Sequence, residues 1–369
     1  MKIPTIINST TNNFDFLRIL AAFLVFFGHT ILITRSTGIL NWDRGLAISA
    51  IGVNIFFIIS GFLITKSWLD NTDIAFFIKK RFLRIYPGLI FAGLFTVLII
   101  GPITTLLSIG TYFQQPNTFT YIINIFSLNL IDITANKLPG VFALNSLPYI
   151  VNASLWTIPI EIGCYLLVAV MGFKKIFTKK ATFLYILIVL LSYSLIYSLN
   201  KDFFTFFQKN STIPYSDIIR LFTYFISGVV IYLYKDAISI SKKQLFALLI
   251  VFLGSAIVGY LELASYFLLP IFVIFIAMTN IDFFKKITQY GDFSYGFYLF
   301  AFPIQQAVSY FSNGRLSFFE YTTIAFLLTL VLAIFSYKFI EKPFLKLKDF
   351  PFIKTTKKYY FLLCKKRVR

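Results

Sequence analysis

Two ionisable residues lie inside one strongly apolar stretch of the sequence. Arg18 and His29, the only histidine of the chain, belong to DFLRILAAFLVFFGHT at residues 15–30. An ionisable side chain in a bilayer core costs roughly 2.5 kcal/mol or more, so such residues typically mark substrate or proton pathways. In a helix, their spacing puts both side chains within about 20° of one face and about 16 Å apart along the axis.

The two residues suit different parts of one reaction. Arg18 carries a permanent charge and a planar set of donors for phosphate or carbonyl oxygens, whereas His29 exchanges protons near neutral pH. The pair predicts a site that binds an extended ligand at one end and moves protons at the other. For either residue alone, the structural alternative is that Arg18 reaches the lipid headgroups and His29 bonds to a neighbouring helix.

Three further charged residues stand in or beside apolar runs. Arg81 and Arg84, in KKRFLRIYPG at residues 79–88, share one helical face, a spacing that suits a phosphorylated cofactor. A plain topology signal would explain this pair equally well. Glu161, in NASLWTIPIEIGCYLL at residues 152–167, has three alternative roles: it pairs with an arginine, orients His29 or stays protonated.

Other polar side chains in apolar runs are candidates for a substrate pocket. These are Asn54, Ser60, Trp156 and Tyr295. Helix packing and interhelical hydrogen bonds would account for Asn54 and Ser60 as well, and Tyr295 suits packing or a polar cavity equally. Glu341 follows the last apolar run, where we expect a surface-exposed helix terminus.

The composition excludes a soluble globular protein. Of 369 residues, 58% are hydrophobic, 20% are aromatic and 13% are charged, and the mean hydropathy is +0.80. Long apolar runs recur along the whole chain, which indicates one membrane bundle rather than an anchored soluble enzyme. Two cysteines and one histidine predict neither a disulfide framework nor a metal site.

The apolar runs and the Lys/Arg clusters beside them predict an all-α, polytopic transmembrane helical bundle. Only seven of the 34 Lys and Arg residues fall on one side of it, so the positive-inside rule predicts that both termini are cytoplasmic. Between the third and fourth spans we expect an interfacial or re-entrant helix at about 118–134. The ten expected spans are residues 16–34, 46–65, 88–108, 154–172, 181–199, 217–235, 245–261, 264–281, 291–311 and 319–340.

We divide the chain into an integral-membrane domain, residues 1–344, and a basic, aromatic cytoplasmic tail, residues 345–369. The net charge of +19 gathers beside apolar runs, so the expected partner is the lipid bilayer and not nucleic acid. We expect the tail to dock on anionic lipid. Residues 1–11 are polar, and we expect no cleavable signal sequence.

Six segments in order over residues 14–344 resemble acyltransferase family 3, membrane proteins that O-acetylate bacterial surface polysaccharides and related glycans. The resemblance implies that Arg18 and His29 are required for transfer and that Arg81 and Arg84 help to bind an acyl-coenzyme A donor. It also implies that the acceptor is met on the far side of the membrane. The six segments are Arg18 with His29, GVNIFFIISGF (52–62), RFLRIYP (81–87), SLWTIPIEIGCY (154–165), SYGFYLFAFPI (294–304) and FIEKPF (339–344).

The sequence departs from the family pattern at Ala301, where many relatives carry a polar residue, often histidine. We therefore expect His29 to act without a second histidine. Some relatives also carry a soluble esterase-like domain, which this sequence does not show. We expect transfer to be completed in the membrane domain or by a separate partner.

The resemblance implies a membrane O-acetyltransferase, an enzyme that transfers acyl groups other than amino-acyl groups, in the bacterial inner membrane. We expect acetyl-CoA as the cytoplasmic co-substrate, and a sugar hydroxyl of a cell-surface polysaccharide or its lipid-linked precursor as acceptor. His29 would act as general base or through an acetyl-histidine, Arg18 would bind the donor, and Glu161 would orient His29 or balance its charge.

Two other classes stay open from the residues alone. One is a glycolipid or small-anion transporter or flippase that uses the intramembrane Arg, His and Glu groups. The other is a structural subunit among polysaccharide-assembly proteins. Within the enzyme class, the acyl group is open between acetyl, succinyl and longer chains.

Overall fold

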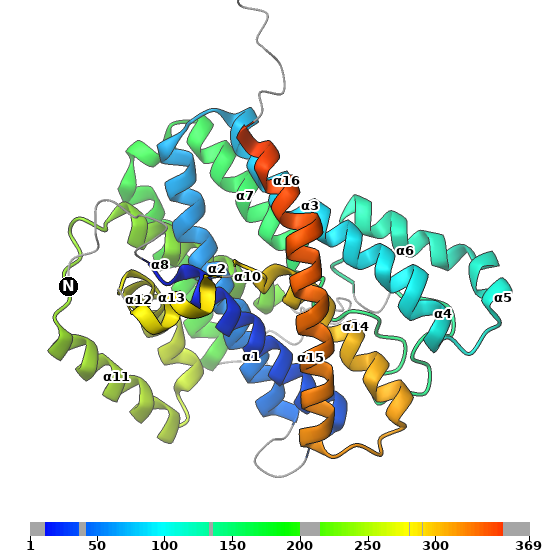
Figure 1. Ribbon diagram of the computed structural model, residues 1–369. Helices are drawn as coiled ribbons and strands as arrows, with labels where there is room; N and C mark the ends of the chain where they lie inside the picture. The colour runs from blue at the N-terminus through cyan, green and yellow to red at the C-terminus, as the bar shows by residue number, and fades with distance from the viewer. Residues whose placement is uncertain are drawn as a thin grey trace, which may run out of the picture.

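The computed structural model describes residues 12–36, 42–132, 136–199, 215–279, 281–289 and 291–349, and these residues form helices joined by loops, with no β-strand (Figure 1). Seven of the described helices are long and apolar enough to cross a membrane. This confirms an all-α, polytopic bundle; most of the expected tail, residues 350–369, lies outside the described residues. The seven are α1 (Phe14–Thr34), α2 (Trp42–Asp70), α3 (Ile74–Phe95) with its continuation to Thr104, α8 (Lys180–Leu199), α10 (Tyr215–Leu233), α12 (Leu261–Met278) and α15 (Phe318–Ser336) with its continuation to Lys346.

Three of the ten expected spans differ from these seven. Helix α7 (Thr157–Phe173) has 17 residues, and α11 (Lys242–Ile257) has 16 residues, none of them buried. Helix α14 (Ser294–Ser312) has 19 residues but carries several polar side chains, and it is buried along most of its length. Because α14 faces protein rather than lipid, it tolerates a polarity that a lipid-facing helix would not.

Helix α3 begins earlier than expected. The expected span started at residue 88, but Pro87 lies inside a continuous helix that starts at Ile74, with Asp73 as N-cap. A π-helical turn (Thr96–Ile100) and α4 (Gly101–Thr104) extend it. Arg81 and Arg84 therefore lie on one helical face, as expected, and on the same helix as the span that follows.

Helix α2 packs closely against α1 on one side and α10 on the other. A Cβ at Gly52 would lie 2.5 Å from the carbonyl oxygen of Ala21, and a Cβ at Gly61 would collide with the carbonyl of Phe225. Gly228 of α10 approaches α2 in the same way. Small residues at these points allow the backbones to touch, which is the usual basis of close helix contact in membranes.

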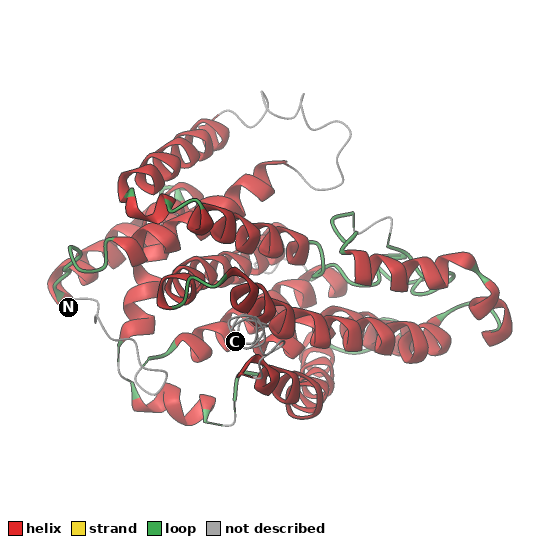
Figure 2. Ribbon diagram, turned by 90° about the horizontal axis from the view of Figure 1, so that it is seen from above, coloured by secondary structure: helices red, strands yellow, loops and turns green. Residues whose placement is uncertain are grey.

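Residues 105–156 cover one end of the bundle with two short helices and a long loop. Helices α5 (Ile109–Gln114) and α6 (Pro116–Ser127) form the region in which we expected an interfacial helix at about 118–134, so α6 ends earlier than expected. Figure 1 and Figure 2 show this pair at one edge of the bundle, where α6 packs against α3. The following loop is fastened to α14, because Gln306 donates to the carbonyls of Leu147 and Ile150 at 2.8 and 2.9 Å.

The last described residues continue α15 beyond Ser336. Helix α15 passes into a π-helical turn (Tyr337–Glu341), α16 (Lys342–Lys346) and a 3₁₀ turn (Leu347–Asp349). We call residues 337–349 the C-terminal hook. The hook lies beside α3 (Figure 1).

Candidate functional site

A cavity of about 350 Å³ lies between α1, α2, α3, α7, α14 and the C-terminal hook. Its lining on α2 runs from Val53 to Ile64, which corresponds to about 16 Å along the helix axis. Cations outnumber carboxylates in the described lining, so the cavity favours an anionic ligand. The charged lining residues are Arg18, Lys80, Arg81, Arg84, Lys348 and Glu161.

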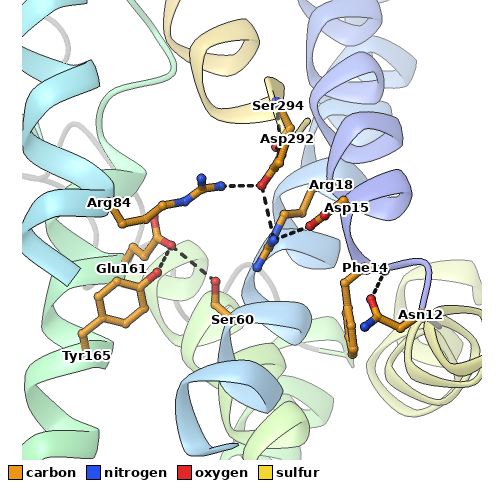
Figure 3. A network of polar contacts seen from close by, with 10 residues as sticks. All are labelled: Asn12, Phe14, Asp15, Arg18, Ser60, Arg84, Glu161, Tyr165, Asp292 and Ser294. Atoms are coloured by element: carbon orange, nitrogen blue, oxygen red, sulfur yellow. Dashed lines mark hydrogen bonds and ion pairs between the residues drawn. The ribbon is translucent and has the colours of Figure 1, made fainter. Parts of the chain in front are cut away.

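Asp292 joins two of these arginines. Its Oδ2 atom lies 2.6 Å from Nη2 of Arg84 and 3.3 Å from Nη1 of Arg18, while its Oδ1 accepts hydrogen bonds from the backbone and hydroxyl of Ser294 (Figure 3). The carboxylate thereby ties α1, α3 and the start of α14 together. Sequence reasoning missed Asp292, although its place at the start of an apolar run was a usable signal.

Arg81 differs from Arg84 in its surroundings. Its Nε is buried and has no hydrogen-bond partner among the described residues, and its guanidinium carbon lies 5.8 Å from the ring centroids of Phe77 and Tyr165. Arg84, by contrast, is neutralised by Asp292. The two arginines share the cavity, as expected, but Arg81 is the better placed of the two to receive an external anion.

Glu161 lies in the same cavity but does not contact His29. Its Oε1 accepts hydrogen bonds from the hydroxyl of Tyr165 and, at 3.3 Å, from Ser60 (Figure 3). The expectation that Glu161 orients His29 is therefore not met by these contacts. The alternative that Glu161 pairs with an arginine fits the structure better, because Glu161 and Arg81 both line the cavity.

Two tyrosines of α14 form part of the wall. Tyr295 donates to the carbonyl of Ile85 at 2.9 Å, and Tyr298 lies 2.8 Å from the hydroxyl of Thr157. Tyr298 and Thr157 line the cavity, and the ring of Tyr298 lies 5.6 Å from that of Phe56, about one helical turn from Val53 on α2. We call the end of the cavity that carries Lys80 and Lys348 the lysine-bearing end. Val53 is the lining residue of α2 farthest from that end, so we call the end near Val53 the inner end of the cavity.

His29 lies beyond the inner end and is not part of the cavity wall. It is 8% exposed, its ring meets the ring of Phe302 edge-on at 5.0 Å, and its Nδ1 has no hydrogen-bond partner among the described residues. Phe302 is one helical turn along α14 from Tyr298, so His29 is about one turn from the inner end. Gln305, one turn further, donates to the Phe26 carbonyl and the Thr30 hydroxyl at 2.8 and 2.7 Å and fixes this turn of α1.

Comparison with known proteins identifies the family of this chain. The sequence model of a family described as "Acyltransferase domain", Acyl_transf_3, matches residues 11–338. The chain belongs to acyltransferase family 3. It is 28% identical over 347 residues to the O-acetyl transferase of Shigella phage Sf6, a match that covers 91% of this chain and 96% of that protein.

A shorter match supports the same relationship. Over 80 residues, this acyltransferase is 48% identical to nodulation protein 10 of Rhizobium leguminosarum bv. viciae, which covers 21% of this chain and 22% of that protein. No solved structure matches the chain. Together with its apolar helices, the family makes this chain a multi-pass membrane O-acyltransferase.

Two expected pocket residues of the acyltransferase lie elsewhere. Asn54 accepts a hydrogen bond from Arg220, which also bonds to Asp217 at 2.8 Å, so Asn54 belongs to a contact between α2 and α10. Trp156 is the residue before α7 and does not line the cavity. Ser60 and Tyr295, the other two candidates, do line it.

The expectation for Glu341 was wrong. The residue is 1% exposed, and its Oε1 accepts a hydrogen bond from Ser336 at 2.9 Å. The sequence places a charged residue at the end of an apolar run, which usually means the surface. Here the helix continues past the apolar run, and the carboxyl group is buried against Gly88 of α3 and Gly296 of α14.

Removing the charge of Asp292 should destabilise the acyltransferase. Asp292→Asn would leave Arg18 and Arg84 without their shared carboxylate, and breaking a buried ion pair costs about 3–5 kcal/mol. We expect a clear fall in the thermal unfolding temperature of the detergent-purified protein. Asp15→Asn is the matched control, because Asp15 also bonds to Arg18 but its side chain is 49% exposed. Equal shifts for the two variants would contradict the role given to Asp292.

Proposed function

We propose that the acyltransferase moves an acetyl group from acetyl-CoA to a sugar hydroxyl of a cell-surface polysaccharide or its lipid-linked precursor. The observation that carries the proposal is the cationic cavity, whose inner end stops about one helical turn from His29. The printed name of the phage relative, an O-acetyl transferase, supports acetyl as the group transferred. The lysine-rich end of the bundle is proposed to face the cytoplasm of a bacterial cell, where acetyl-CoA is made.

The donor is proposed to enter from the lysine-bearing end. Its phosphates would meet Arg81 first, because Arg84 and Arg18 already share Asp292. Arg18 and Arg84 would add positive potential and hydrogen bonds to the pantetheine carbonyls. The uncharged pantetheine arm would then extend along α2 toward the inner end.

The thioester would lie near Glu161, Tyr298 and His29. In the general-base route, His29 takes the proton of the sugar hydroxyl as the sugar oxygen attacks the thioester carbonyl. The C–S bond then breaks, and the coenzyme A thiolate leaves and receives a proton. In the alternative route, His29 attacks first, and acetyl-histidine then passes the acetyl group to the sugar.

The buried position of His29 suits either route. Its Nδ1 is already shielded from solvent, and Phe302 and the Gln305 contacts hold the turn that carries it. The acceptor would approach from the side opposite the donor cavity, since the donor occupies the side that contains Arg18. Ala301 offers no polar group, so no second base is assigned on α14.

Loss of His29 should abolish transfer. We expect His29→Ala membranes to incorporate at least about 10²-fold less label from radiolabelled acetyl-CoA into surface polysaccharide than wild-type membranes of equal protein content. Phe23→Leu is the control, because Phe23 is a 39% exposed residue of the same helix. Equal incorporation by His29→Ala and wild type would remove His29 from the chemistry. No incorporation by wild type would overturn acetyl-CoA or polysaccharide as substrate.

The two arginines of α3 should behave differently. Arg81→Ala should raise the KM for acetyl-CoA by about tenfold or more with little change in unfolding temperature, because Arg81 is the arginine available to an external phosphate. Arg84→Ala should chiefly lower the unfolding temperature, because it leaves Asp292 with Arg18 alone. Steady-state kinetics and thermal unfolding of both variants test this. An unchanged KM for acetyl-CoA in Arg81→Ala would contradict a role in donor binding and leave Arg81 as part of the positive cluster that sets the membrane topology.

A further inference from the structure

The C-terminal hook is anchored beside the cavity by a buried carboxyl group. Glu341 fits a niche made by two glycines: a Cβ at Gly296 would lie 3.0 Å from its Oε1, and one at Gly88 would lie 3.4 Å from its Cγ. Ser336 donates to Glu341 from within the same helix. Gly291 leaves room for the ring of Tyr337 in the same manner. The hook is therefore seated on α3 and α14 and not loosely attached.

This seating brings two hook residues to the cavity. Leu345 and Lys348 are part of its lining, and Lys348 has an exposed side chain. Lys80, on α3, lines the same cavity one residue before Arg81. These two lysines come from opposite parts of the sequence and lie on the side away from the inner end.

The cationic lining residues follow an order along α3. Arg84 meets Arg18 at Asp292, Arg81 precedes it by three residues, and Lys80 lies nearest the N-terminal end of the helix, while Lys348 is an exposed residue near the end of the C-terminal hook. Coenzyme A has a matching order, since its thioester and pantetheine arm are followed by a diphosphate and then by a separate phosphate on the 3′ oxygen of the ribose. The planar guanidinium suits the diphosphate, whereas a compact ammonium group suits a single phosphate as a point charge.

We propose that Lys348 of the C-terminal hook, together with Lys80, binds the 3′-phosphate of the acyl-CoA donor. The assignment rests on the proposed function, since it takes acyl-CoA as the ligand of the cavity. It makes the hook a part of the donor site, and it gives the buried Glu341 a purpose, which is to hold the hook where Lys348 reaches the ligand.

The 3′-phosphate can be tested by removing it from the donor. For wild-type protein we expect kcat/KM with acetyl-CoA to exceed that with 3′-dephospho-acetyl-CoA by about tenfold, the value of one charge-assisted contact. Lys348→Ala should lower kcat/KM for acetyl-CoA and leave that for the dephospho donor unchanged, so that the ratio falls toward one. Lys348→Arg, which keeps the charge, should retain most of the ratio.

Lys346→Ala is the matched control, because Lys346 is an exposed lysine of the same hook that does not line the cavity. Its donor ratio should equal that of wild type. A ratio in Lys348→Ala equal to the wild-type ratio, or a wild-type protein that uses both donors equally well, would overturn the assignment while leaving the proposed function in place. Failure of the wild-type protein to use either donor would overturn the proposed function itself.

Discussion

The site depends on one carboxylate that is shared by two arginines. Each arginine taken into an apolar bundle costs several kcal/mol unless its charge is met. Asp292 meets Arg18 and Arg84 together at 3.3 and 2.6 Å, and these residues come from α1, α3 and the start of α14. The same contact that offsets the charge therefore fixes three of the helices that surround the cavity.

The ion pairs with Asp292 also give the cations of the cavity different roles. Two arginines are committed to Asp292, while Arg81 has no hydrogen bond from its buried Nε within the described chain. Lys80 and Lys348 stand further out. In the proposed function, the phosphates of the donor meet these cations, and its uncharged arm runs toward Glu161 and the turn that carries His29. The charge distribution would then orient the donor before any chemistry takes place.

The sequence predicted the positions of the helices better than the contacts between helices. Apolar runs set the helices, and helical spacing put Arg81 and Arg84 on one face. That Arg18, Arg81 and Arg84 serve one site was implied by the family resemblance, and all three line the cavity together with Glu161. Asn54 and Trp156 were placed wrongly in that site. Which neighbouring helix a polar residue meets depends on packing, and Asn54 meets Arg220 of α10, a pairing that no local pattern contains.

Asp292 and Glu341 escaped prediction for a related reason. Both stand at the border of an apolar run, where the usual expectation is water, yet Asp292 is buried beside Arg18 and Arg84 and Glu341 is buried against α3 and α14. The start of α3 was also placed too late, since Pro87 lies inside the helix. Membrane helices tolerate proline because neighbouring helices and side chains satisfy the freed backbone groups.

The central claim is that the cationic cavity holds the acyl-CoA donor with its acyl end toward His29. The most direct measurement is a structure of the detergent-purified protein with an unreactive acetyl-CoA analogue, in which a methylene group replaces the thioester sulfur. The account predicts that the phosphates lie among Arg81, Lys80 and Lys348 and that the acetyl group lies at the inner end beside Tyr298. An analogue bound outside this cavity, or bound within it in the reverse direction, would contradict the account.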